Sequence, residues 1–168
     1  LCLCCLTATG FAGSIRNPSF EIDADGDRVP DGWTYGAGHY GRWREKLKKQ
    51  LGKGTLVDNQ AASGNRSLRI MVPKHNEGKY WNQGWEGLSY RQRVPTKPFT
   101  TYTMSMKVLN KDAEGLGDYA FLYALAGEFR NSEAFATIRF GDKPTGKWVE
   151  KTMVFQTGRY ANYTVLSV

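Results

Sequence analysis

The sequence predicts an all-β protein, an antiparallel β-sandwich. From residue 54 onward, runs rich in Val, Ile, Thr, Tyr and Phe recur about every 8 to 15 residues, separated by clusters of Gly, Pro, Asn and Asp. Several runs alternate apolar and polar residues, which is typical of strands with one buried and one solvated face. This spacing favours a sandwich or barrel over βαβ units.

The alternation also predicts which side chains form the core. In segments 67–72 and 101–108, apolar residues occupy every second position, so they share one face of a strand. The predicted core residues are Leu68, Ile70, Val72, Tyr102, Met104, Met106 and Val108. Further strands are expected over 119–125, 134–141 and 151–156, with Met153 and Phe155 facing the same side.

The chain of 168 residues fits one domain that can bury a core without disulfide bonds. Its three cysteines, Cys2, Cys4 and Cys5, all lie at the N-terminus, so the rest of the chain can hold neither a disulfide framework nor a cysteine zinc site. Residues 1–12 are an apolar run followed by small residues, and we interpret them as the end of a secretory signal peptide. Residues 13–168 would then form a secreted or cell-surface domain. A buried N-terminal strand or a reading-frame error would be the alternative for 1–12.

The formal net charge is +7, and much of it is concentrated near residues 42–53. Trp43, Leu47 and Leu51 repeat every four residues there, which predicts a short amphipathic helical insertion near 42–52. A solvated insertion is the favoured interpretation, and contact with an anionic glycan, lipid or nucleic acid is the alternative. No nucleic-acid partner is expected for the domain, and no segment is long and apolar enough to span a membrane.

Residues 17–33 are unusually acidic and predict a calcium site. Asp23, Asp25 and Asp27 alternate, so their carboxylates can converge, and Gly26 permits the sharp turn that such a loop needs. Calcium prefers dense oxygen ligands of this kind, although the spacing is not that of an EF-hand. The proposed ligands are Glu21, Asp23, Asp25, Asp27 and Asp31. The alternative is a solvated turn in which the Asp side chains cap their own backbone.

This acidic segment also carries a family resemblance. The strings NPSFE and DGW near residues 17–33 resemble the start of carbohydrate-binding modules of the cellulose- and xylan-binding jelly-roll type. Segments 61–70, 90–108 and 145–158 follow in the order of that family. The resemblance implies a β-sandwich that binds glycans and holds a structural calcium ion. In that family a further strand follows the position of residues 161–168, so a last strand is expected to be missing here, with an exposed sheet edge as the consequence.

Aromatic residues among polar ones predict where a glycan would bind. Segment 79–93 combines Trp81, Trp85 and Tyr90 with amide, carboxylate and guanidinium groups, including Arg91. The apolar face of a sugar ring packs on aromatic rings, and its hydroxyls bond to such polar groups. The alternative is that these rings fill one end of the sandwich. In that case Tyr119, Tyr123 and the face carrying Arg91 are the next candidates.

These features favour a non-catalytic module that binds a polysaccharide, one monomeric unit of a larger extracellular protein. Two histidines, no cysteine in the body of the chain and no nucleophile-elbow motif leave little for nucleophilic catalysis. A glycoside hydrolase or polysaccharide lyase on a jelly roll is the first alternative, because two carboxylates suffice for glycoside hydrolysis. An adhesion or structural domain without a sugar site is the second.

Overall fold

The computed structural model describes residues 2–9, 15–37, 53–71, 88–111, 121–126, 135–139 and 144–168. These residues form ten strands and no helix, which confirms the all-β prediction. Every strand pairing is antiparallel. Within this part of the chain, no helix has the length and hydropathy needed to cross a membrane. The helical insertion expected near 42–52 lies outside the described residues.

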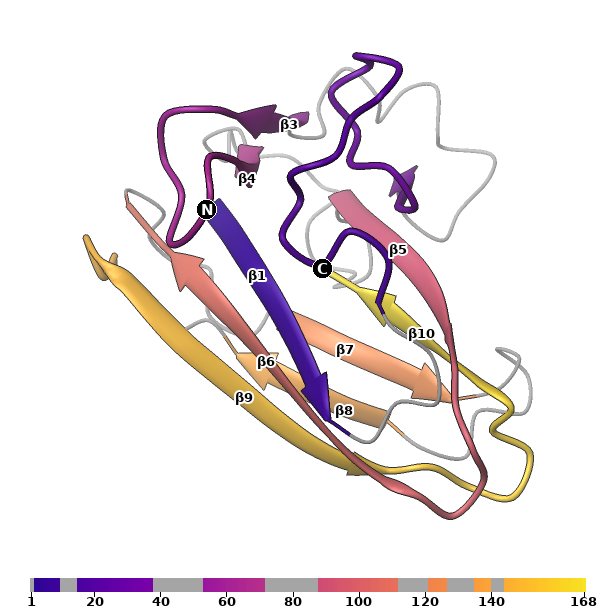
Figure 1. Ribbon diagram of the computed structural model, residues 1–168. Helices are drawn as coiled ribbons and strands as arrows, with labels where there is room; N and C mark the ends of the chain where they lie inside the picture. Colours follow the sequence, from indigo (N-terminus) through magenta and orange to yellow (C-terminus); the bar gives the residue numbers. More distant parts are fainter. Residues whose placement is uncertain are drawn as a thin grey trace, which may run out of the picture.

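The strands form two five-stranded sheets, which lie one in front of the other in Figure 1. Sheet A has the order β3(Lys53–Val57), β4(Ser67–Met71), β1(Cys2–Thr9), β6(Thr101–Leu109), β9(Trp148–Gln156). Sheet B has the order β2(Thr34–Ala37), β5(Leu88–Pro95), β10(Tyr163–Ser167), β7(Phe121–Ala126), β8(Phe135–Arg139).

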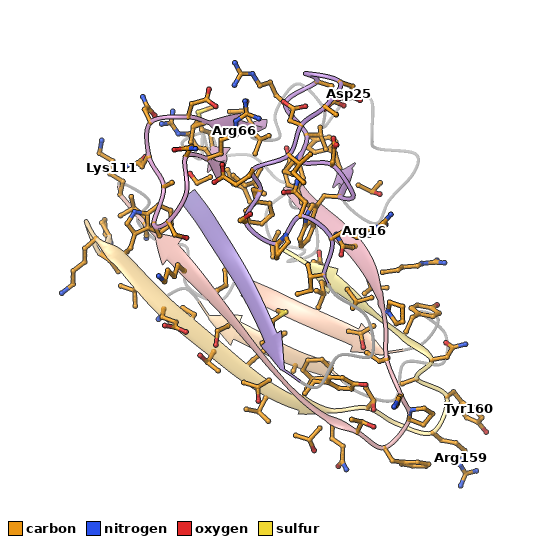
Figure 2. The ribbon with its side chains drawn as sticks, viewed as in Figure 1. Arg16, Asp25, Arg66, Lys111, Arg159 and Tyr160 are labelled. Carbon is orange, nitrogen blue, oxygen red and sulfur yellow. The ribbon has the colours of Figure 1, made fainter. Side chains whose placement is uncertain are left out.

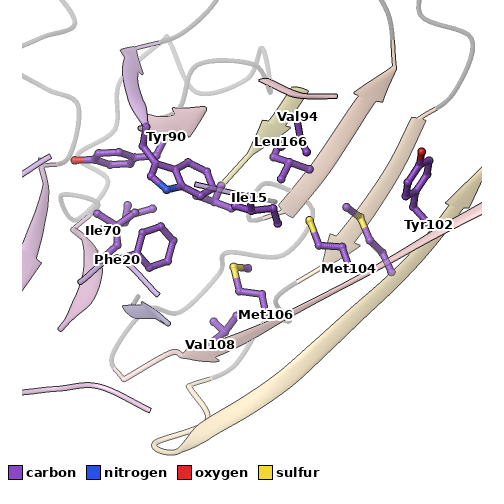
Figure 3. Close-up of a cluster of buried hydrophobic side chains, with 14 of the residues drawn as sticks. Ile15, Phe20, Ile70, Tyr90, Val94, Tyr102, Met104, Met106, Val108 and Leu166 are labelled. Carbon is purple, nitrogen blue, oxygen red and sulfur yellow. The ribbon is translucent and has the colours of Figure 1, made fainter. Parts of the chain in front are cut away.

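Both sheets contribute to one hydrophobic core, shown in Figure 3. Sheet A supplies Met104 and Met106 from β6, each fully buried, and sheet B supplies Val94 and Leu166 from β5 and β10. Alternate residues of β6 are buried, because a strand turns successive side chains to opposite faces. The predicted core residues Leu68, Ile70, Tyr102, Met104, Met106, Val108, Met153 and Phe155 are all buried, which confirms the alternation, while Val72 lies outside the described residues.

The strands nearest the two ends of the chain, β1 and β10, both occupy interior positions of a sheet. β1, which contains residues 2–9 of the segment interpreted as a signal peptide, pairs with β6 along most of its length and with β4 through Cys2 and Leu3. β10 pairs with β5 on one side and β7 on the other. The last residue, Val168, exchanges two backbone hydrogen bonds with Tyr90, at 2.8 and 3.0 Å.

Candidate functional site

The acidic segment forms a loop that is fastened at its start. The Asn17 side chain donates to the Ile22 carbonyl at 2.7 Å and accepts from the Ile22 N–H at 3.1 Å. Oε1 of Glu21 accepts the backbone N–H groups of Asn65 and Arg66, both at 2.9 Å. Glu21 therefore holds the loop between β3 and β4 against the acidic segment, and this role uses one of its two carboxylate oxygens.

Three of the five predicted metal ligands come together. Asp23, Asp25 and Asp27 each offer a carboxylate oxygen, and these oxygens lie within 4.8 Å of one another. Asp25 and Asp27 are exposed, whereas Asp23 is half-buried. The sequence spacing produces this cluster because the intervening Gly26 adopts a left-handed turn with φ of 72°. Glu21 and Asp31 lie outside this group of three.

The same side chains also support the loop backbone. Asp25 accepts the N–H of Asp27 at 3.2 Å, and Asp27 accepts the N–H of Val29 at 2.7 Å. These bonds are the local backbone capping that the sequence offered as the alternative to a calcium site. Asp31 accepts the N–H of Ala24 at 3.2 Å. In each of these three bonds the accepting atom is Oδ1, so the bonds do not involve Oδ2 of Asp25, Asp27 or Asp31.

An ion-pair network joins the acidic loop to the β3–β4 loop. Asp58 contacts the Arg28 guanidinium at 3.2 Å and the Arg66 guanidinium at 2.8 Å. The hydrogen bond from Arg28, together with Arg66, holds the pKa of Asp58 below its usual value. Sequence reasoning missed Asp58, because nothing near it in the chain indicates which distant arginines it meets.

Tyr90 lies in the interior. Its side chain is only 1% exposed and belongs to the core cluster, so it has no open ring face for a sugar. The ring packs against the backbone of Gly54 in β3 and against Tyr35, whose ring centroid is 5.5 Å away. Burial, with smaller contributions from Tyr35 and Asp27, raises the pKa of Tyr90 to about 12. Tyr90 therefore has the structural role in the sandwich interior that the sequence offered as the alternative to sugar stacking. Trp81, Trp85 and Tyr119 lie outside the described residues.

The remaining two sugar-site candidates occupy one row across sheet B. Arg91 and Tyr123 are both register partners of Ser167, on its two sides. The row continues to Thr34 beyond Arg91 and to Thr137 beyond Tyr123. Residues paired in this way share a face of the sheet. Because the core residues Val94 and Leu166 lie on the other face, this row belongs to the face that points away from the core.

Two buried oxygens lack a hydrogen-bond partner among the described side chains: Oδ1 of Asp23 and Oγ of Ser167. Buried polar groups nearly always have a partner, so each of these two requires an explanation. One lies in the aspartate cluster and the other in the middle of the Arg91–Tyr123 row. Among the described residues, the two candidate sites are thus the places where a buried side-chain polar atom has no partner.

The chain matches no model of a known protein family, and it matches no curated protein sequence.

Proposed function

We propose that this protein is a non-catalytic, extracellular glycan-binding module of the β-sandwich type, with a structural calcium ion in its acidic loop. The observation that carries the proposal is the aspartate cluster of the acidic loop, in which Oδ1 of Asp23 is buried without a hydrogen-bond partner. A cation would satisfy this carboxylate.

The donor set of the acidic loop fits Ca²⁺. The ion binds oxygens at roughly 2.3–2.6 Å, so two oxygens on one ion lie at most about 5 Å apart. The three aspartate oxygens, within 4.8 Å of one another, satisfy that limit without rearrangement. Asp23, Asp25 and Asp27 would hold the ion, which would neutralise three adjacent negative charges and fix the loop. Glu21 and Asp31 instead support this site through their bonds to the backbone.

The outer face of sheet B supports glycan binding. Arg91, half-buried on β5, would offer a charged fork of donors on this face. Tyr123, the third residue of the row, would supply an aromatic ring. Since strands lie about 4.8 Å apart, the row from Arg91 to Tyr123 spans roughly 10 Å, a length suited to one or two sugar units. On the same face, the Arg93 guanidinium lies 5.0 Å from the centre of the Tyr163 ring.

We expect Arg91→Gln to weaken polysaccharide binding by about tenfold or more, because a hydrogen bond from a charged group contributes roughly 1.5–3 kcal/mol. The measurement is affinity electrophoresis against a panel of soluble polysaccharides, with the thermal melt recorded for each variant. Arg69→Gln is the matched control, since Arg69 is also half-buried but lies on sheet A. Equal weakening by both variants, or no binding to any polysaccharide of the panel, would contradict the glycan site.

A further inference from the structure

Two turns meet at the end of the molecule away from the acidic loop. The β5–β6 turn has Pro98 and Phe99 at its centre, and the β9–β10 turn has Arg159 and Tyr160. Figure 2 shows Arg159 and Tyr160 at the opposite end from Asp25. We call these two turns, residues 97–100 and 158–161, the paired turns.

The paired turns are held together by buried polar contacts. Oγ1 of Thr157, a residue only 2% exposed, accepts the N–H of Thr100 at 2.9 Å and donates to the Lys97 carbonyl at 2.6 Å. The Tyr102 hydroxyl accepts the N–H of Lys97 at 2.8 Å. The N–H of Thr96 donates to the Asn162 carbonyl at 3.1 Å. The turns therefore present their outer side chains from a fixed backbone.

Phe99 is an unfavourable choice for folding at its position. Its φ is 50°, in the left-handed region, and it follows a proline in a tight turn, where glycine is the residue that turn chemistry prefers. A bulky side chain in this region is strained. Yet its side chain is 66% exposed, so packing does not compensate for the strain. A strained residue with an exposed ring points to a role outside the fold.

Each exposed ring has a cation close to it in the chain. Tyr160 is 61% exposed on the neighbouring turn. Lys97 and Arg159, which lie two residues before Phe99 and directly before Tyr160 in the chain, are both exposed. Segments 95–101 and 156–163 contain no Asp or Glu. The paired turns thus combine an aromatic tip with positive charge that has no acidic neighbour within either segment.

We propose that the paired turns are a peripheral membrane anchor that binds an anionic lipid surface. Aromatic rings insert at the boundary between headgroups and acyl chains, and Lys and Arg side chains bind the lipid phosphates around them. The rings stand on two separate turns among exposed cations. An anionic bilayer offers both the apolar boundary that such rings enter and the phosphates that the cations bind, whereas a neutral sugar chain offers no charge to the cations.

The test is co-sedimentation of the protein with phosphatidylcholine vesicles, with and without phosphatidylserine. We expect binding to the anionic vesicles that salt weakens. Phe99→Gly should reduce the affinity by about tenfold, because the ring no longer inserts. The same variant should melt at the same or a higher temperature, since glycine relieves the left-handed strain. Lys97→Gln and Arg159→Gln should each reduce the affinity by about fivefold.

Matched controls lie elsewhere on the surface. Val154→Ser removes another exposed apolar side chain, 62% exposed on β9, and Lys111→Gln removes a cation that Figure 2 shows far from Arg159. Both should bind vesicles like the unchanged protein. The proposal is overturned if anionic vesicles do not bind, if the controls weaken binding as much as Phe99→Gly, or if Phe99→Gly reduces binding to a soluble anionic polysaccharide equally.

Discussion

Replacing Gly64 by alanine is expected to lower the free energy of unfolding by about 3 to 5 kcal/mol. Gly64 has φ of 70°, and a Cβ at this position would overlap with Oε1 of Glu21 and lie 2.9 Å from its Cδ. The Glu21 carboxylate would have to leave the N–H groups of Asn65 and Arg66, so backbone strain and the loss of two charge-assisted hydrogen bonds act together. Urea denaturation of both proteins measures the difference.

Gly146 provides the matched control for Gly64. It has a similar φ of 64°, but a Cβ there meets nothing within 4 Å. Gly146→Ala should therefore cost only the backbone strain, about 1 to 2 kcal/mol. If both substitutions lower the free energy of unfolding by the same amount, the contact between Glu21 and the β3–β4 loop contributes nothing to stability beyond the backbone strain at Gly64.

Gly54→Ala should cost about 3 kcal/mol for a different reason, the overpacking of a buried aromatic ring. A Cβ on Gly54 would overlap with Oη and Cε2 of Tyr90 and lie 2.6 Å from Cζ. Because Tyr90 is buried, its ring cannot swing aside without opening the core. The displaced phenol would become more hydrated, so its pKa should fall from about 12 toward the usual value for tyrosine. Urea denaturation and ultraviolet titration of the tyrosines measure the two effects.

The double variant Gly54→Ala with Tyr90→Leu separates this contact from a general intolerance of Gly54. A leucine lacks the outer ring atoms that the new Cβ would meet. The loss of unfolding free energy caused by Tyr90→Leu should therefore be smaller in the Gly54→Ala variant than in the unchanged protein. Strict additivity of the two costs would contradict the packing of Tyr90 on Gly54.

Local pattern was sufficient to predict the fold class and the buried face of the strands. The alternation in β6 follows directly from burying one face, and Tyr102 and Met104 are fully buried as expected. The aspartate cluster was predictable for the same reason, since Asp23, Asp25 and Asp27 lie within five residues of one another and their geometry depends on a single turn.

Contacts between distant segments could not be predicted from the same pattern. Polar residues surround Tyr90 in the chain, so the pattern left both a sugar-binding and a core position open, and packing between the sheets places the ring on Gly54. The partnership of Asp58 with Arg28 and the row that joins Arg91 to Tyr123 through Ser167 depend on loop closure and strand register. Neither is encoded in neighbouring residues.

The most direct test of the proposed calcium-bound module is its thermal melt with calcium and with a chelator. An ion that binds only the folded protein stabilises it by about 2.7 kcal/mol at one hundred times its dissociation constant, which for a chain of this size raises the Tm by roughly 5 to 10 °C. Asp23→Asn and Asp25→Asn should abolish most of this increase, whereas Glu150→Gln, a change at an exposed acid on β9, should preserve it. A Tm that is the same in calcium and in chelator would contradict the calcium site and with it the central claim of the proposed function.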